Sequence, residues 1–279
     1  MNVTVTTLCE NTAGEPGFMA EWGLSILVQA GGVTVLFDTG LTSAAVRNAD
    51  KLGVDLRTVD TIVLSHAHAD HTGGLREVLR RTGEVEVVAH PGIWDLKCKR
   101  RSAEEKAEYN GTPFAREELE KAAKFTLTKE PLYLSENLLT TGEVQVTTDF
   151  ETIEPYFYLK QGGDLQPDPF ADDLAFILKT EKGLVVILGC AHRGMINTLR
   201  HARILTGDER VYAVIGGTHL YPKTDEQIGK TIESLKEIDV QRIGVSHCTG
   251  FHASMRLAQA FGDAFFHNNA GTIFTLDSI

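Results

Sequence analysis

Three histidines and one aspartate are crowded into six consecutive positions of this chain, in the pattern H-x-H-x-D-H. They are His66, His68, Asp70 and His71. Neutral imidazole and carboxylate groups are ligands that suit Zn, Fe and Mn. Burying such groups without partners costs roughly 1–3 kcal/mol each, and a metal ion removes that cost. The spacing therefore predicts a metal site rather than a set of structural core histidines.

The flanking residues predict how these side chains are positioned. The apolar run 61–64 predicts a short buried strand, and the segment after Thr72-Gly73-Gly74 predicts a helix with apolar residues at Leu75 and Val78. The cluster thus falls on a tight strand-to-helix loop, where the backbone can direct several side chains toward one point.

Later segments repeat this arrangement. Strands expected at 184–188, 211–215 and 242–245 are each followed by a loop that carries a histidine, namely His192, His219 and His247. Ligands and catalytic groups gather beyond strand ends in such sheets, so we expect these loops to converge on one site. His90 follows a further strand, 85–89; it either contacts this site or is a polar strand-end residue.

Strands are also expected at 3–8, 24–28 and 33–37, with a Gly31-Gly32 hairpin turn between the last two. Asp38 follows, where its carboxylate could cap a helix expected at 43–51. The stretch from 94 to about 129 is rich in Lys, Arg and Glu, with helix-like runs at 103–109 and 114–125. We expect one domain, 1–279, in which an insertion at about 94–170 is solvated surface or a lid over the metal site.

Four basic residues open the insertion. The simplest interpretation is that these side chains are solvated surface, and the alternative is that they form an anion-binding patch. These residues are Lys97, Lys99, Arg100 and Arg101.

Bulk properties narrow the function classes. A net charge of −11 over 279 residues argues against a nucleic-acid binder, which needs a basic face. The N-terminus lacks the basic start and apolar core of a signal peptide, and no apolar run approaches about 18 residues. The four cysteines show no C-x-x-C spacing, so a disulfide framework is not expected. We expect a soluble, cytoplasmic protein with a small-molecule substrate, no nucleic-acid or membrane partner, and a homodimer as one possible assembly.

The H-x-H-x-D-H motif, the T-G-G that follows it and the upstream F-D-T-G at 37–40 together resemble the metallo-β-lactamase fold superfamily. The resemblance implies an α+β, four-layer αββα sandwich, here with a mostly helical insertion. It also implies that His66 and His68 hold one ion and that Asp70 and His71 hold a second. Asp38 would orient one of these ligands.

This chain departs from the superfamily pattern in two places. The usual T-P-G-H-T segment is missing, and Pro169-Phe170-Ala171-Asp172-Asp173 stands near its place. The usual Gly-Asp is Gly189-Cys190, and we infer that His192 replaces the missing histidine while His247 supplies the last one. Cys190 is either a thiolate ligand in place of the bridging aspartate or a buried, apolar-like thiol.

Three stretches indicate which branch of the superfamily the chain resembles. Residues 172–192, 211–220 and 246–250 are similar to a branch described as 7,8-dihydropterin-6-ylmethyl-4-(β-D-ribofuranosyl)aminobenzene 5′-phosphate synthase-like. Its members are associated with the synthesis of tetrahydromethanopterin-type cofactors.

The preferred hypothesis is a metal-dependent hydrolase that uses a mono- or dinuclear metal-bound water on a small, phosphate-bearing substrate. Two divalent ions are expected, zinc first, with iron or manganese as alternatives. Asp70 would ligate and orient the water. His219 would donate a proton, stabilise an oxyanion or act as a brace. The helix start after Thr249-Gly250 could hold a substrate anion.

Two other hypotheses stay open. One is the synthase reaction, in an aromatic, anion-tolerant pocket that Trp22, Phe157, Tyr158 and the segment 97–101 could supply. The other is a non-catalytic module that binds a metal or ligand, against which the complete first motif argues.

Overall fold

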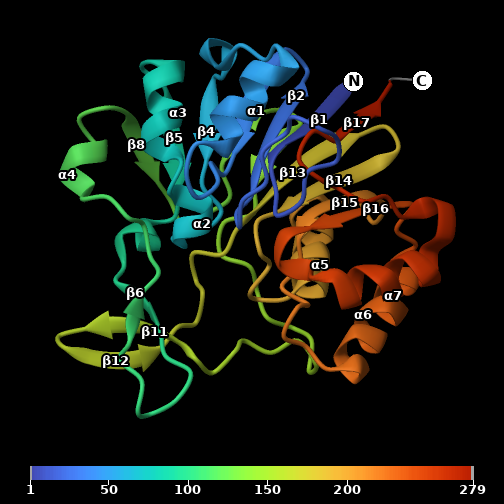
Figure 1. The fold of residues 1–279 in the computed structure, drawn as a ribbon. Coiled ribbons are helices and arrows are strands. Elements are labelled where there is room, and N and C mark those ends of the chain that lie inside the picture. The colour runs from blue at the N-terminus through green and yellow to red at the C-terminus, as the bar shows by residue number, and fades with distance from the viewer. Residues whose placement is uncertain (1, 278–279) are drawn as a thin grey trace.

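Two β-sheets face each other and carry helices on their outer sides in a computed structural model that describes residues 2–277 (Figure 1). This is the expected αββα sandwich. The first sheet has seven strands, in spatial order β17 (Ile273–Leu276), β1 (Val3–Cys9), β2 (Ser25–Ala30), β3 (Val33–Phe37), β4 (Thr61–Val63), β5 (Glu86–Ala89) and β8 (Lys124–Leu127). The second has six, in the order β16 (Arg242–Ser246), β15 (Val211–Gly217), β14 (Gly183–Leu188), β13 (Ala175–Thr180), β10 (Leu138–Thr140) and β9 (Tyr133–Ser135).

Strict alternation of side chains along the strands builds three apolar layers. In β3, Val35 and Phe37 face the other sheet, whereas Leu36 between them faces the outer helices. The strand β14 does the same, with Ile187 turned inward and Val186 turned outward. Both sheets are therefore buried on both faces, which explains their continuous apolar runs.

The helices cover the two outer faces. The first sheet is covered by α1 (Ala44–Leu52) and α3 (Leu75–Thr82), and the second by α5 (Met195–Thr206), α6 (Asp225–Ile238) and α7 (Phe251–Phe261). Only one stripe of each helix faces the sheet.

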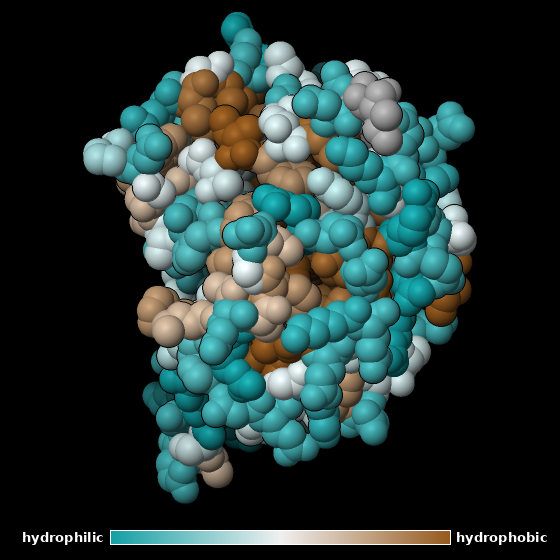
Figure 2. Space-filling model, turned by 90° about the vertical axis from the view of Figure 1, so that its right-hand side faces the viewer, coloured by the Kyte–Doolittle hydropathy of each residue, from teal (hydrophilic) through white to brown (hydrophobic). Residues whose placement is uncertain are grey.

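Figure 2 views the side that lies on the right in Figure 1, and hydrophilic side chains cover most of that surface. Every helix within residues 2–277 is too short or too polar to cross a membrane.

Parallel pairing sets the position of the site. The strands β3, β4 and β5 run parallel to one another, as do β14, β15 and β16. Their carboxyl ends therefore lie at one edge of each sheet, and the histidine-bearing loops leave from that edge. The short helix α2 (Ala69–Thr72) lies in the first of these loops.

The insertion is not mostly helical, so this part of the fold prediction was wrong. Its only α-helix is the four-residue α4 (Arg116–Leu119), and residues 103–109 are turns that lead into a strand. Much of its ordered structure is instead a four-stranded sheet of β12 (Asp164–Pro167), β11 (Phe157–Gln161), β6 (Lys97–Lys99) and β7 (Glu108–Tyr109). Parts of the two runs expected to be helical pair as strands, residues 108–109 with β6 and residues 124–125 with β5. This pairing overrides the local helix propensity.

The two glycines after the first motif allow a close approach of backbone to backbone. A Cβ atom on Gly73 would lie 2.2 Å from the carbonyl oxygen of Leu41, and one on Gly74 would lie 2.0 Å from that of Thr39. The segment that follows β3 thus packs directly against the metal-motif loop, in space that only glycine leaves free.

We therefore expect Gly74→Ala to lower the free energy of unfolding by about 1–3 kcal/mol, because the added methyl group forces the two segments apart. Gly229→Ala is the matched control. Its added Cβ in α6 would meet nothing closer than a side-chain nitrogen of Arg256 at 3.9 Å, and alanine is the better helix former. Urea denaturation checks both variants, and a Gly74→Ala midpoint equal to that of the unaltered protein would contradict the packing argument.

Candidate metal centre

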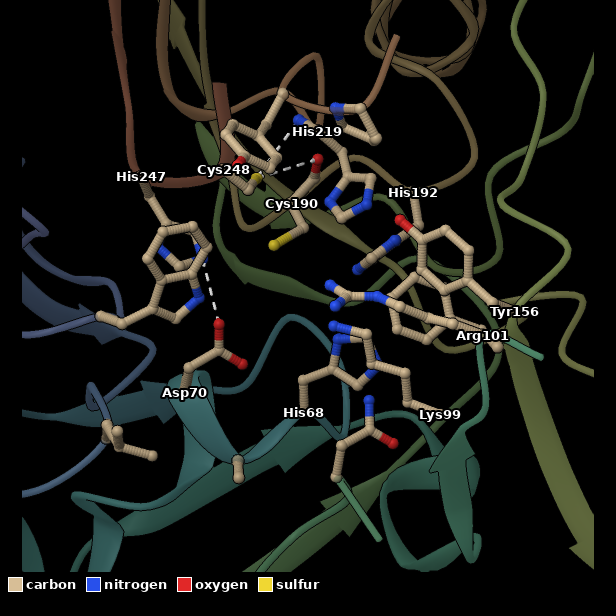
Figure 3. A pocket seen from close by; sticks show the side chains of 17 residues that line it. His68, Asp70, Lys99, Arg101, Tyr156, Cys190, His192, His219, His247 and Cys248 are labelled. Atoms are coloured by element: carbon tan, nitrogen blue, oxygen red, sulfur yellow. Dashed lines mark hydrogen bonds and ion pairs between the residues drawn. The ribbon is translucent and has the colours of Figure 1, made fainter. Parts of the chain in front are cut away.

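The loops beyond the parallel strands meet at one cavity of about 430 Å³. Its lining includes His68, Asp70, Cys190, His192 and His247 (Figure 3). The first two come from the loop after β4 and the others from the loops after β14 and β16. Both sheets therefore contribute to the same centre.

Two groups of side chains have the spacing of metal ligands. In the first, the ligand atoms of His66, His68 and His192 all lie within 4.8 Å of one another. The same holds for a second group, which consists of Asp70, His71 and His247.

Cys190 lies between the two groups. Its thiol is within the same 4.8 Å limit of His66 and His71, one from each group. The Cys190 Sγ is 3.1 Å from His71 Nε2. The structure thus places this sulfur where one ligand could reach two ions.

Several imidazole nitrogens of this centre face one another across short distances. His66 Nε2 lies 3.0 Å from His68 Nδ1, and His71 Nε2 lies 3.2 Å from His247 Nε2. Both ring nitrogens of His192 are buried without a hydrogen-bond partner. Such contacts are unfavourable between buried polar groups and become favourable when a cation lies between the lone pairs. The side chains therefore fit a divalent metal centre.

The protonation states agree with this fit. Burial lowers the pKa of His66, His68 and His192 well below the usual value, so these rings are neutral near pH 7. Neutral imidazole is the form that ligates a metal.

Asp70 and His71 form the charged side of the centre. The Asp70 Oδ2 lies 3.2 Å from His247 Nε2 and 3.9 Å from His71 Nε2. Burial alone would raise the pKa of Asp70, but the neighbouring imidazoles outweigh burial and hold it well below the usual range. Burial would likewise lower the pKa of His71, but Asp38 and Asp70 raise it to about 9.

The Asp38 carboxylate lies behind the candidate ligands and holds two of them in position. Its Oδ2 is 2.7 Å from His71 Nδ1 and accepts a hydrogen bond of 2.7 Å from the Ser65 hydroxyl. That hydroxyl lies 2.8 Å from His66 Nδ1. Asp38 thus leaves the Nε2 atoms of His66 and His71 free for ligation, as a partner that orients ligands does.

Two residues that the sequence analysis missed do the same for His247. Glu10 Oε1 accepts a hydrogen bond of 2.6 Å from the His247 backbone N–H, and Asn11 Oδ1 lies 2.9 Å from His247 Nδ1. These contacts hold His247 at a positive φ of 52°, which L-residues rarely adopt. In the sequence, Glu10-Asn11 looks like any polar loop, because its partner lies more than 230 residues away.

His219 faces His192 at the rim of the centre, with ring centroids 4.1 Å apart. Its Nε2 is 3.2 Å from Glu154 Oε2, and Lys223 also pairs with Glu154. Burial would lower the pKa of His219, but Cys248 and Glu154 raise it to about 9. His219 also has ligand spacing to Cys190 and His192, so the geometry allows both a proton donor and a further ligand.

The structure does not bring three of the expected residues to the centre. His90 Nδ1 accepts a hydrogen bond from the Gly92 N–H, and its Nε2 pairs with Glu143 at 3.0 Å, so neither nitrogen is available. Thr249 is buried, 2.9 Å from the Thr218 hydroxyl. Gly250 lies under the Tyr221 side chain, and neither Thr249 nor Gly250 lines the cavity.

The segment 169–173 supports the ligands from behind. The Phe170 ring stacks on His192 with centroids 3.9 Å apart, and Asp172 Oδ2 accepts a hydrogen bond of 2.9 Å from the Ala67 N–H, between two ligands. The other Asp172 oxygen and Asp168 each lie 2.7 Å from the buried Lys97 Nζ. One ion-pair network therefore ties β6 to the metal-motif loop.

Comparison with known proteins agrees with this geometry. A family model described as the metallo-beta-lactamase superfamily matches residues 23–196. A protein of Methanocaldococcus jannaschii named 7,8-dihydropterin-6-methyl-4-(beta-D-ribofuranosyl)-aminobenzene-5'-phosphate synthase is 32% identical, over 98% of this chain and 96% of its own. An uncharacterised protein of the same organism is 29% identical, over 96% and 98% of the two chains. A solved structure of a metal-dependent hydrolase of the beta-lactamase superfamily is 27% identical, with a TM-score of 0.86 over 99% of this chain and 100% of that one.

The buried network yields a stability prediction. Lys97→Met leaves Asp168 and Asp172 buried without a cation, and we expect it to cost about 3–5 kcal/mol of unfolding free energy. Lys99→Met, two residues along the same strand, removes a partly exposed lysine without an ion pair and is expected to cost far less. Urea denaturation of both variants checks this, and equal midpoints for the two would refute the role of the network.

Proposed function

The chain belongs to the metallo-beta-lactamase superfamily, and we propose that this enzyme is a metal-dependent hydrolase acting on a small, phosphate-bearing substrate. One observation carries the proposal. Seven potential ligand side chains, drawn from both sheets, converge with their nitrogens and sulfur turned toward one another at the floor of a cavity. Among residues 2–277, His68 Nε2 and both ring nitrogens of His192 have no hydrogen-bond partner although they are buried.

We assign two divalent ions to this centre, and zinc as their identity. His66, His68 and His192 would hold one ion, Asp70, His71 and His247 would hold the other, and Cys190, which has ligand spacing to both groups, would supply a thiolate. A mixed imidazole, carboxylate and thiolate set suits zinc. When bound, such ions activate water as a nucleophile and polarise the bond under attack.

The remaining steps fall to residues of the chain. The Asp70 side chain is 20% exposed, toward the cavity, and its ionised carboxylate can accept a hydrogen bond from the attacking water and so orient it. His219 pairs with Glu154 through Nε2, which leaves Nδ1 as the atom that can donate a proton to the leaving group. The raised pKa of His219 keeps that proton in place near neutral pH.

A second candidate is the synthase activity that the Methanocaldococcus jannaschii relative is named for. Likeness over nearly the full length of both chains favours it. So do the aromatic side chains of the cavity wall, which are Trp22, Tyr156, Phe157 and Tyr221. Tyr158 was expected among them, but its ring lies under Arg100 and outside the lining.

One experiment tests both candidates. Zinc-loaded protein is assayed for hydrolysis of phosphomonoesters, phosphodiesters, lactones and thioesters, and separately for coupling of a dihydropterin to ribofuranosylaminobenzene phosphate. We expect Asp70→Ala to lower turnover at least about 100-fold, because it removes the group that orients the nucleophile. His252→Ala, on an exposed pair with Asp225, should leave turnover unchanged. Full turnover by Asp70→Ala would end the proposal, and coupled product without hydrolysis would favour the synthase.

The proposed role of Cys190 as a thiolate ligand has its own optical test. We expect cobalt-substituted protein to show a thiolate-to-cobalt charge-transfer band in the near ultraviolet. Cys190→Ser should abolish that band and lower the metal content per chain. Cys98→Ser is the matched control, since this buried thiol lies on β6 near the Leu96 carbonyl. A band that persists in Cys190→Ser would assign the sulfur ligand elsewhere.

A further inference from the structure

The four basic residues at the start of the insertion have different surroundings. Only Lys97 and Lys99 lie in β6, whereas Arg100 and Arg101 follow it. The buried side chain of Lys97 forms ion pairs with the carboxylates of Asp168 and Asp172. The guanidinium of Arg100 lies over the Tyr158 ring, 5.2 Å from its centroid. Lys99 and Arg101 are left to line the cavity.

These two cations share one cavity wall, and the Asp70 and Glu108 carboxylates act on Lys99 only from beyond ion-pair distance. Among residues 2–277, no carboxylate forms an ion pair with the side chain of Lys99 or Arg101, whereas Lys97 beside them has two. Burial and the nearby Arg101 lower the pKa of Lys99. Two neighbouring like charges that face a cavity are unfavourable unless an anion of matching charge joins them.

Figure 3 shows where these side chains lie relative to the metal centre. Lys99, Arg101 and Tyr156 occupy one wall, Asp70 and His247 the opposite wall, and His68 and His192 lie between. The cavity of about 430 Å³ is much larger than a phosphate group and in the range of pockets that hold a whole small molecule. A substrate can therefore reach both walls.

We propose that Lys99 and Arg101 bind a terminal phosphate monoester group that the enzyme recognises but does not cleave, so that the reacting bond of the same molecule lies over the histidines. A phosphate monoester carries a charge of about −1.5 to −2 at pH 7, which matches two cations better than a carboxylate does. The guanidinium can bind two phosphate oxygens, and the ammonium supplies a point charge. This inference rests on the proposed function for the reacting end of the substrate only.

The test measures binding separately from turnover. The probe is benzylphosphonate, a mimic of a phosphate monoester that cannot be hydrolysed, titrated calorimetrically into zinc-loaded protein at fixed ionic strength. We expect Arg101→Met and Lys99→Met each to raise the Kd about tenfold, because each removes a charge-assisted contact. Arg100→Met, next to Arg101 in the chain but with its guanidinium over Tyr158 and outside the cavity lining, should stay within about twofold of the unaltered protein. Phenylacetate, a monoanion of similar size, should bind at least about tenfold more weakly than the probe.

Several outcomes overturn the subsite. They are an equal Kd for Arg101→Met and Arg100→Met, phenylacetate binding as tight as that of the probe, and probe binding that disappears in His192→Ala but survives in Arg101→Met. The last result would place the anion on the metal centre.

The two proposals can fail independently. Probe binding that shows the expected variant effects, in a protein with no hydrolase activity, keeps the subsite and rejects the proposed reaction. Hydrolysis with an unchanged Kd and KM in Arg101→Met keeps the reaction and rejects the subsite. If both hold, Arg101→Met raises KM with little change in kcat, because the phosphate contact is the same in the ground and transition states.

Discussion

The close approach of buried imidazole nitrogens is the constraint on which the rest of this structure depends. His66 Nε2 lies 3.0 Å from His68 Nδ1, and His71 Nε2 lies 3.2 Å from His247 Nε2. A folded chain tolerates this only when a cation compensates the lone pairs or when surrounding contacts impose the geometry. Here the surrounding contacts are extensive, and much of the fold can be understood as their scaffold.

Those contacts come from residues without ligand chemistry of their own. Asp38 fixes two rings through direct and hydroxyl-mediated hydrogen bonds, and Asn11 fixes a third. Phe170 and Asp172 take the place of a ligand-bearing segment of the superfamily and press a ring and a carboxylate against the centre instead. These four side chains come from three separate segments, so the geometry of the centre depends on the tertiary fold and not on any one loop.

Whether a feature could be predicted from the sequence depends on how far apart in the chain its interacting residues lie. The first motif is local, and so are the apolar strands that precede each histidine, and both were predicted close to their observed bounds. The strand β3 matches residue for residue. The insertion was misjudged because its Lys- and Glu-rich runs favour a helix locally, while strand pairing of residues 108–109 with β6 and of residues 124–125 with β5 decides the outcome. The roles of Glu10, Asn11 and Lys97 depend on partners that no local pattern reveals.

The centre draws its side chains from both halves of the sandwich, with His66, His68 and His71 on one sheet and Cys190, His192 and His247 on the other. Ions bound as proposed would link the two halves of the sandwich. Mass action then couples folding to metal supply, since any ligand that binds only the native state adds RT ln(1 + [L]/Kd) to its stability. A shortage of the ion would thus shorten the lifetime of the folded molecule as well as abolish its activity. The abundance of the protein in a cell would therefore follow the local zinc level.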